Sequence, residues 1–295
     1  MRTTSLCQIV AVLSFATIAG CSSHAGDPAR QYGADPYLPE PHEYLLPPMS
    51  VPKAIGWNVG EKPTVAPGLM VEALATGLEH PRTLYTLPNG DILVVESNSP
   101  GTEPFRPKDF IAGKVKARAG AGETGGNRIT LLRDTNGDGR PELRTVFIDH
   151  LHSPYGIVLV DDTLYVANTD AILAFNYVPG VTRITSPGVK LAELPAGPID
   201  HHWTKSMTAS ADGSKLYVGV GSNSNVTENG MAVEEGRAAI YEVDRLTGAK
   251  RIFASGTRNP TSVAFEPQTH QLFAVVNERD EIGRASCRER VFVGV

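Results

Sequence analysis

The sequence predicts an all-β protein with the architecture of a β-propeller. Four segments, at residues 80–97, 153–169, 203–221 and 259–277, share one pattern: a short apolar strand, a polar turn, and a second strand of the L-x-V or F-x-V type. Each of them is typical of a β-hairpin. Further strand pairs lie between the hairpins, such as "RITLLRD" with "LRTVFID" and "AAIYEVD" with "KRIFASG". Convincing helical periodicity is missing throughout, and we expect the nearest candidate, "KDFIAGKVKARAGAG" at 108–122, to be an insertion loop.

The spacing of the four hairpins favours a propeller over a β-sandwich. The hairpins are unevenly spaced but keep a constant unit, which indicates blades with insertions between them. Blades of four strands around an axis protect the sheet edges, whereas a sandwich, the alternative, usually spaces its strands more evenly. Four units would not normally close this kind of ring, so we expect an incomplete propeller of about four blades.

Residues 1–20 are predicted to be a lipoprotein signal peptide. Arg2 precedes the apolar run "IVAVLSFATIAG", which is too short to span a bilayer comfortably and ends on small residues just before Cys21. Cys21 would become the lipid-bearing N-terminus, although an ordinary secretory signal with an incidental cysteine is the alternative. Ser22 is not the aspartate that favours inner-membrane retention. We therefore expect a periplasmic protein held at the outer membrane by its lipid only.

The remainder divides into three parts. Residues 21–66 are rich in proline and predict a tether, and residues 67–281 hold the propeller. Residues 282–295 depart from the composition of the rest and resemble the translation of a common sequencing adapter; a genuine basic C-terminal strand is the alternative. We expect an artefact there and leave it out of the predicted fold. The three cysteines are Cys7, Cys21 and Cys287, so the exported domain would have no disulfide.

Composition and missing motifs exclude several functions. The formal net charge is −5, which disfavours nucleic acid as a partner. The chain lacks a G-x-G-x-x-G after a strand, a Walker A sequence and a G-x-S-x-G, and it has no His-x-x-x-His pair on a helix. Nucleotide cofactors and helix-borne zinc therefore have no support, and serine hydrolysis has no local signal.

The stretch "DTNGDGRPE" at 134–142 begins like an EF-hand calcium loop, with oxygen ligands at alternate positions and then Gly139. The twelfth position is Thr145 instead of glutamate, and strands flank the stretch where an EF-hand has helices. The pattern predicts a polar hairpin turn.

Polar residues precede the first strand of each predicted blade. The leading loops of a propeller converge on its axis, so these residues would meet in one funnel although they lie far apart in sequence. A histidine there suits a general base, and an arginine there suits polarising a carbonyl or holding an anion. For two of them, His80 and His152, capping of a turn or a hydrogen bond between blades is the favoured interpretation. The set comprises His80, His152, His201, His202, Arg258 and Asn259.

Four stretches together resemble the glucose/sorbosone dehydrogenase family, most strongly its sorbosone dehydrogenase-like branch. They are "NRITLLRDTNGDGRPELRTVF", "HHWTKSMTASADGSKLYVGVGSNSN", "GTRNPTSVAFEP" and "VVNERDE", and the similarity runs from Val71 to Glu281. The family consists of six-bladed propellers that use pyrroloquinoline quinone (PQQ) and calcium. The resemblance implies the same fold, incomplete here at about four blades.

The resemblance also implies roles for single residues. The position of His202 ahead of Asp212 matches the catalytic base, with His201 where relatives carry aspartate. The "RNP" motif places Arg258 on the quinone carbonyl and Asn259 on the cofactor. Backbone carbonyls near Arg279 and Asp280 would bind calcium.

The function implied is the oxidation of a sugar or sugar-derived aldehyde in the periplasm, with electrons passing to an unidentified acceptor. Cofactor-binding lysines and arginines of the last two blades of the family are missing, so we expect the 295-residue chain to be inactive. The alternatives are a non-catalytic binding or scaffolding propeller and, with less support from His202 and Arg258, a calcium-dependent sugar-lactone hydrolase.

Overall fold

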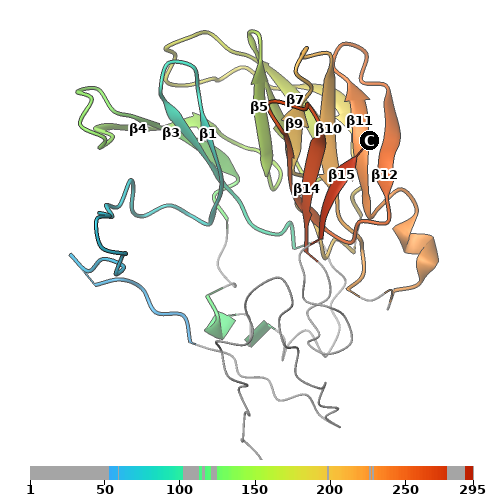
Figure 1. Cartoon of the computed structure of the whole chain (residues 1–295), viewed down its shortest axis with the longest axis horizontal. Helices are drawn as coiled ribbons and strands as arrows, with labels where there is room; N and C mark the ends of the chain where they lie inside the picture. The colour runs from blue at the N-terminus through green and yellow to red at the C-terminus, as the bar shows by residue number, and fades with distance from the viewer. Residues whose placement is uncertain are drawn as a thin grey trace, which may run out of the picture. The chain divides into compact units, whose positions relative to one another are not determined.

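A computed structural model describes most of the chain beyond the predicted signal and tether (Figure 1). The described residues are 53–58, 60–101, 113–114, 117–120, 125–197, 199–225, 227, 229–277 and 290–294. They all belong to one compact unit, Pro48–Glu281 with Ala285–Val295. The predicted signal peptide, Cys21, Arg279 and Asp280 lie outside the described residues. Within the described residues, no helix is both long and apolar enough to cross a membrane.

The described part is built from antiparallel sheets, as predicted. The first sheet contains β1 (Pro81–Thr86), β2 (Ile92–Glu96), β3 (Arg128–Arg133) and β4 (Leu143–Ile148). The second contains β5 (Gly156–Val160), β6 (Thr163–Ala167), β7 (Ala171–Asn176) and β8 (Val189–Glu193). In both sheets the strands pair in chain order.

The third and fourth sheets continue the pattern. The third contains β9 (Met207–Ala209), β10 (Lys215–Val220), β11 (Ala239–Asp244) and β12 (Lys250–Ser255), with the 3-10 helix η2 (Met231–Glu234) between β10 and β11. The fourth has three strands, β13 (Pro260–Phe265), β14 (Leu272–Val276) and β15 (Arg290–Gly294). The last strand comes from the segment that sequence analysis left out of the fold. Its backbone pairs with β14, and its proposed adapter origin stays a prediction.

Adjacent sheets meet through their first strands. β1 contacts β5, β5 contacts β9, and β9 contacts β13. A series of antiparallel sheets that contact one another through their first strands is the arrangement of propeller blades, so the all-β fold and the propeller type are confirmed, whereas the number of blades stays a prediction. The four predicted hairpins are the pairs β1–β2, β5–β6, β9–β10 and β13–β14. Residues 113–114 and 117–118 have helical backbone within the segment expected to be a loop.

The core lies between the sheets. One cluster joins the first and second sheets through side chains such as Leu93, Phe147 and Leu164, all with no exposed surface. Equivalent clusters join the second sheet to the third and the third to the fourth. Full burial of one such side chain contributes about 1.5–3 kcal/mol, so stacking of sheets stabilises each blade.

The stretch at 134–142 is the turn between β3 and β4, as predicted. Asp134 accepts hydrogen bonds from the backbone amides of Gly137 (2.6 Å) and Gly139 (2.7 Å), and Glu142 accepts them from the amide and hydroxyl of Thr135 (both 2.7 Å). These bonds to backbone amides lower the pKa values of both carboxyl groups. The hydrogen bonds that these carboxylates accept hold the turn in its conformation.

Candidate functional site

A cavity of about 360 Å³ lies where the leading loops of the blades converge. Its wall contains residues from the start of β1, from the loops before β5, β9 and β13, and from the end of β14. The lining residues are Pro81, Arg82, Tyr155, His201, His202, Trp203, Thr204, Asn259, Thr261 and Asn277. The predicted convergence of leading loops therefore brings together His201, His202 and Asn259.

His202 is held in a defined orientation by Ser222. Its Nδ1 lies 3.0 Å from both the backbone oxygen and the hydroxyl oxygen of Ser222. The Ser222 hydroxyl donates its single hydrogen to the carbonyl of Ser224, at 2.7 Å. Both Ser222 oxygens thus accept, so Nδ1 carries the ring hydrogen and Nε2 is the nitrogen that can take a proton.

Close packing at Gly221 keeps the imidazole in place. A Cβ atom added to Gly221 would lie 2.3 Å from the Cβ of His202 and 2.8 Å from Oδ1 of Asn259. Only glycine allows the end of β10 to approach the loop that carries His202. The Asn259 side chain is buried, and its Oδ1 has no hydrogen-bond partner among the described residues. An orphaned buried oxygen at a cavity wall favours a ligand that can donate to it.

Arg258 lies beside this cavity but points elsewhere. Its Nε donates to the backbone oxygen of Asn225 (2.9 Å), its Nη1 donates to that of Asn277 (3.1 Å), and its Nη2 donates to Oδ1 of Asn225. Its own carbonyl accepts the amide of Ser222, at 2.8 Å. Arg258 therefore joins the His202 support to the Asn259 loop, and among the described residues it is not part of the cavity wall.

The other two histidines lie in bends, before β1 and before β5. His80 has a φ of 50°, and its carbonyl accepts the amide of Ser97 at 3.1 Å. His152 is half-exposed and lies 3.2 Å from Asp170 through its Nδ1. Neither contributes to the cavity lining found in the described residues.

An aromatic wall closes one side of the cavity. Tyr155 and Trp203 meet edge to face, with ring centroids 6.1 Å apart, and the guanidinium of Arg82 lies 5.5 Å above the Trp203 ring. Burial raises the pKa of the Tyr155 hydroxyl, which donates to the carbonyl of Thr261 at 3.3 Å. Sequence reasoning gave no role to these three residues. Their position in the leading segments of three blades was the signal that could have found them.

A buried charged cluster lies behind the loop that carries His202. Lys205 has no exposed surface, Asp200 is 2% exposed, and the side chain of Arg237 is 3% exposed. Asp200 pairs with Arg237 and lies 4.0 Å from the Lys205 ammonium. Burial lowers the pKa of Lys205 to about 8, against the opposing effect of Asp200. Sequence reasoning missed this cluster because Arg237 lies far along the chain from the loop that carries Asp200 and Lys205.

The arrangement offers a specific set of chemical groups. An imidazole with one assigned basic nitrogen, an orphaned amide oxygen, a guanidinium and two aromatic rings surround a space large enough for a small molecule. This set suits proton abstraction from a hydroxyl next to a planar or anionic partner.

Comparison with known proteins identifies a family whose profile matches the part of the chain that carries most of this site. The profile of the TrAA12-like family matches residues 123–291, more than half of the chain. Among curated proteins there is no match.

Solved structures share the fold. The PQQ domain of pyranose dehydrogenase from Coprinopsis cinerea, in its holo form, is 19% identical with a TM-score of 0.58, over 78% of this chain and 51% of that one. The calcium structure of a family AA12 enzyme from Trichoderma reesei is 17% identical with a TM-score of 0.59, over 79% and 56%. The chain thus spans about half the length of these two structures.

Proposed function

Since this chain belongs to the TrAA12-like family, we propose that the protein is a PQQ-dependent oxidoreductase that oxidises a sugar or a sugar-derived aldehyde. The observation that carries the proposal is His202, an oriented base on the wall of a cavity of suitable size. Two structural relatives, a PQQ domain and a carbohydrate-active enzyme, favour the same chemistry.

The cavity residues fit PQQ, a planar tricyclic molecule with three carboxylates and ring carbonyls. Trp203 and Tyr155 offer flat apolar surface, and Arg82 offers a charge partner for a carboxylate. The orphaned Oδ1 of Asn259 can accept from a ring N–H. We assign Arg82, Asn259 and Trp203 to holding the cofactor. Arg258 can polarise a carbonyl there once its guanidinium exchanges Asn225 for the cofactor.

PQQ, when bound, supplies a two-electron acceptor. The chain's own contribution is the proton. Nε2 of His202 takes the hydroxyl proton of the substrate, and the imidazolium formed is stabilised because Nδ1–H already donates to Ser222. The buried Trp203 ring and the half-buried Tyr155 ring exclude water from one side of the site.

Four features of the proposal come from the sequence and its resemblance. They are a six-bladed propeller for the intact protein, export to the periplasm with a lipid anchor at Cys21, calcium bound near Arg279 and Asp280, and an external electron acceptor. Sorbosone-like aldehydes belong to the proposed substrate class.

The proposal is tested on the intact protein, with the six blades that the resemblance implies, because the 295-residue chain by itself is expected to be inactive. The purified protein is titrated with PQQ and calcium, and a dye-linked assay with aldoses and sugar aldehydes follows. We expect a red-shifted quinone absorbance and turnover. His202→Ala should keep the absorbance change and lose roughly 10²- to 10⁴-fold in kcat, the usual contribution of a general base. His152→Ala is the matched control. If PQQ causes no spectral change, the proposal is wrong and a non-catalytic binding propeller takes its place.

A further inference from the structure

The buried cluster behind the cavity binds backbone on both sides of His202. The ammonium of Lys205 donates to the carbonyl of Trp203 at 2.9 Å. The hydroxyl of Thr169 lies 2.7 Å from Oδ2 of Asp200 and 3.1 Å from the same Trp203 carbonyl. The residue that follows His202 is therefore fixed by two side chains from two different blades.

The opposite side of His202 is fixed by the same cluster. Nε of Arg237 donates to the carbonyl of Gly221, at 3.1 Å, while its Nη2 pairs with Asp200. Gly221 packs against the Cβ of His202, and its neighbour Ser222 accepts the hydrogen on Nδ1. Asp200 thus connects the segment that carries the imidazole to the segment that orients it.

A buried charged cluster of this kind lowers the free energy of unfolding unless its charges make specific interactions. Removing one carboxylate and two cations from water costs several kcal/mol per ion, and apolar side chains of similar volume often stabilise a fold as well or better. The two cations donate to the carbonyls of Trp203, Gly221 and Pro195, and Asp200 accepts from Arg237 and Thr169. Two of these carbonyls flank His202.

We propose that Lys205 is a positioning residue, which together with Asp200 and Arg237 fixes the backbone at Trp203 and Gly221 so that the imidazole of His202 keeps one orientation in the cavity wall. This inference rests on the proposed function only for its kinetic consequence. The orientation of His202 is a property of the chain itself and can be measured without cofactor.

The experiment is imidazole NMR on the full chain labelled with ¹⁵N-histidine. Eight histidines are present, and His202→Gln assigns the signal of interest. We expect wild-type His202 to show a single Nδ1–H tautomer. Lys205→Met should broaden the signal or shift it toward a tautomer mixture, and Lys205→Arg, which keeps the charge and a donor, should restore part of it.

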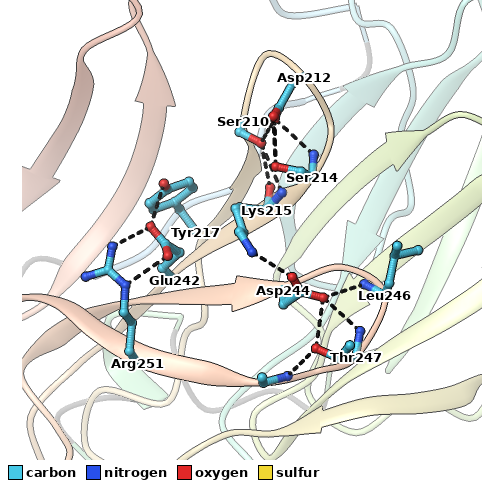
Figure 2. A network of polar contacts seen from close by, with 11 residues as sticks. Ser210, Asp212, Ser214, Lys215, Tyr217, Glu242, Asp244, Leu246, Thr247 and Arg251 are labelled. Atoms are coloured by element: carbon cyan, nitrogen blue, oxygen red, sulfur yellow. Dashed lines mark hydrogen bonds and ion pairs between the residues drawn. The ribbon is translucent and has the colours of Figure 1, made fainter.

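Two further variants make the result decisive. Thr169→Val preserves shape and removes both hydroxyl contacts, so it should change the His202 signal in the same direction even if Lys205→Met fails to fold. Lys215→Met is the matched control. Lys215 lies on β10, pairs with Asp244 at 2.6 Å (Figure 2), and is 34% exposed. It should leave the His202 signal unchanged.

Kinetics supply the second measurement. In the intact protein with PQQ bound, Lys205→Met should lower kcat roughly 10- to 100-fold with little change in KM, as expected when a catalytic group is misplaced. A His202 signal that is identical in wild type, Lys205→Met and Thr169→Val overturns the inference. Absence of PQQ binding and turnover in wild type overturns the proposed function instead, and the NMR result still decides the role of Lys205.

Discussion

The third sheet carries a lysine–aspartate pair at each of its two ends, and the two pairs differ in almost every physical respect. At the cavity end, Lys205 and Asp200 are 0% and 2% exposed and share Arg237. At the opposite end, Lys215 and Asp244 are 34% and 30% exposed and lie 2.6 Å apart (Figure 2). The same pair of residue types therefore serves two purposes.

At the opposite end of the sheet, the exposed carboxylates stabilise turns. Asp244 accepts hydrogen bonds from the amide and hydroxyl of Thr247 (2.9 and 2.8 Å), in the turn between β11 and β12. Asp212 accepts bonds from Ser210 and Ser214 in the turn between β9 and β10 (Figure 2). These carboxylates shape their own turns, whereas Asp200 joins segments that lie far apart in sequence. The comparison teaches that burial, and not residue type, separates a turn cap from a support of the site.

The largest effect is expected for Asp200→Asn. It would leave Lys205 and Arg237 buried without their carboxylate, and breaking a buried ion pair costs about 3–5 kcal/mol of the free energy of unfolding. Urea unfolding monitored by circular dichroism measures this. The matched change at the exposed end, Asp244→Asn, should have a much smaller effect. Equal effects of the two variants would show that the two ends do not differ as described.

The second-largest expected effect is a pH dependence of the free energy of unfolding. Burial lowers the pKa of Lys205 from 10.5 to about 8, while Asp200 and Asp170 raise it and Arg237 lowers it. Between pH 8 and 10.5 the unfolded chain binds a proton that the folded chain does not, so the free energy of unfolding should rise with pH in that window, by on the order of 3 kcal/mol. Urea midpoints of wild type and Lys205→Met from pH 7.5 to 10.5 measure the difference. Parallel curves for the two proteins would contradict it.

A third effect is expected for Gly221→Ala. The new methyl group would meet the Cβ of His202 at 2.3 Å, so His202 or β10 must move. Overpacking of this kind costs about 1–3 kcal/mol, and we also expect the His202 imidazole signal to shift. Gly137→Ala is a control without steric contact, although its positive φ adds strain of its own. An unchanged melting temperature and His202 signal in Gly221→Ala would contradict the packing argument.

The smallest effect is expected for Asp212→Asn. Hydrogen bonds from Ser210 and Ser214 lower the pKa of Asp212 from 3.8 to about 2. Its contribution to stability is therefore present above pH 3.8 and is lost as the pH falls toward 2. Because the carboxylate is fully exposed, the change should be slight. Melting temperatures of wild type and Asp212→Asn should differ a little at neutral pH and converge in acid; a gap that widens in acid would contradict this.

Much of the fold followed from local patterns. The alternation in "KLYVGVG" predicts β10, and the turn cluster before it predicts the hairpin, because both depend on residues close together in the chain. The placement of His202 and Asn259 ahead of inner strands also followed, since a propeller brings leading loops together. The direction of the Arg258 side chain did not follow, because Asn225 and Asn277 come from other segments.

The sequence by itself determined the strand order, the hairpin turns and the set of loops that meet at the cavity, because alternation and turn chemistry act over a few residues. Only the tertiary structure decided that Lys205 is buried and Lys215 is not, and that Arg82 and Tyr155 join His202 at the cavity wall. Burial and charge pairing depend on what another blade places nearby. Lys205, in the loop before β9, therefore has a lowered pKa, whereas Lys215, on β10, has a raised one, and the two side chains have different roles.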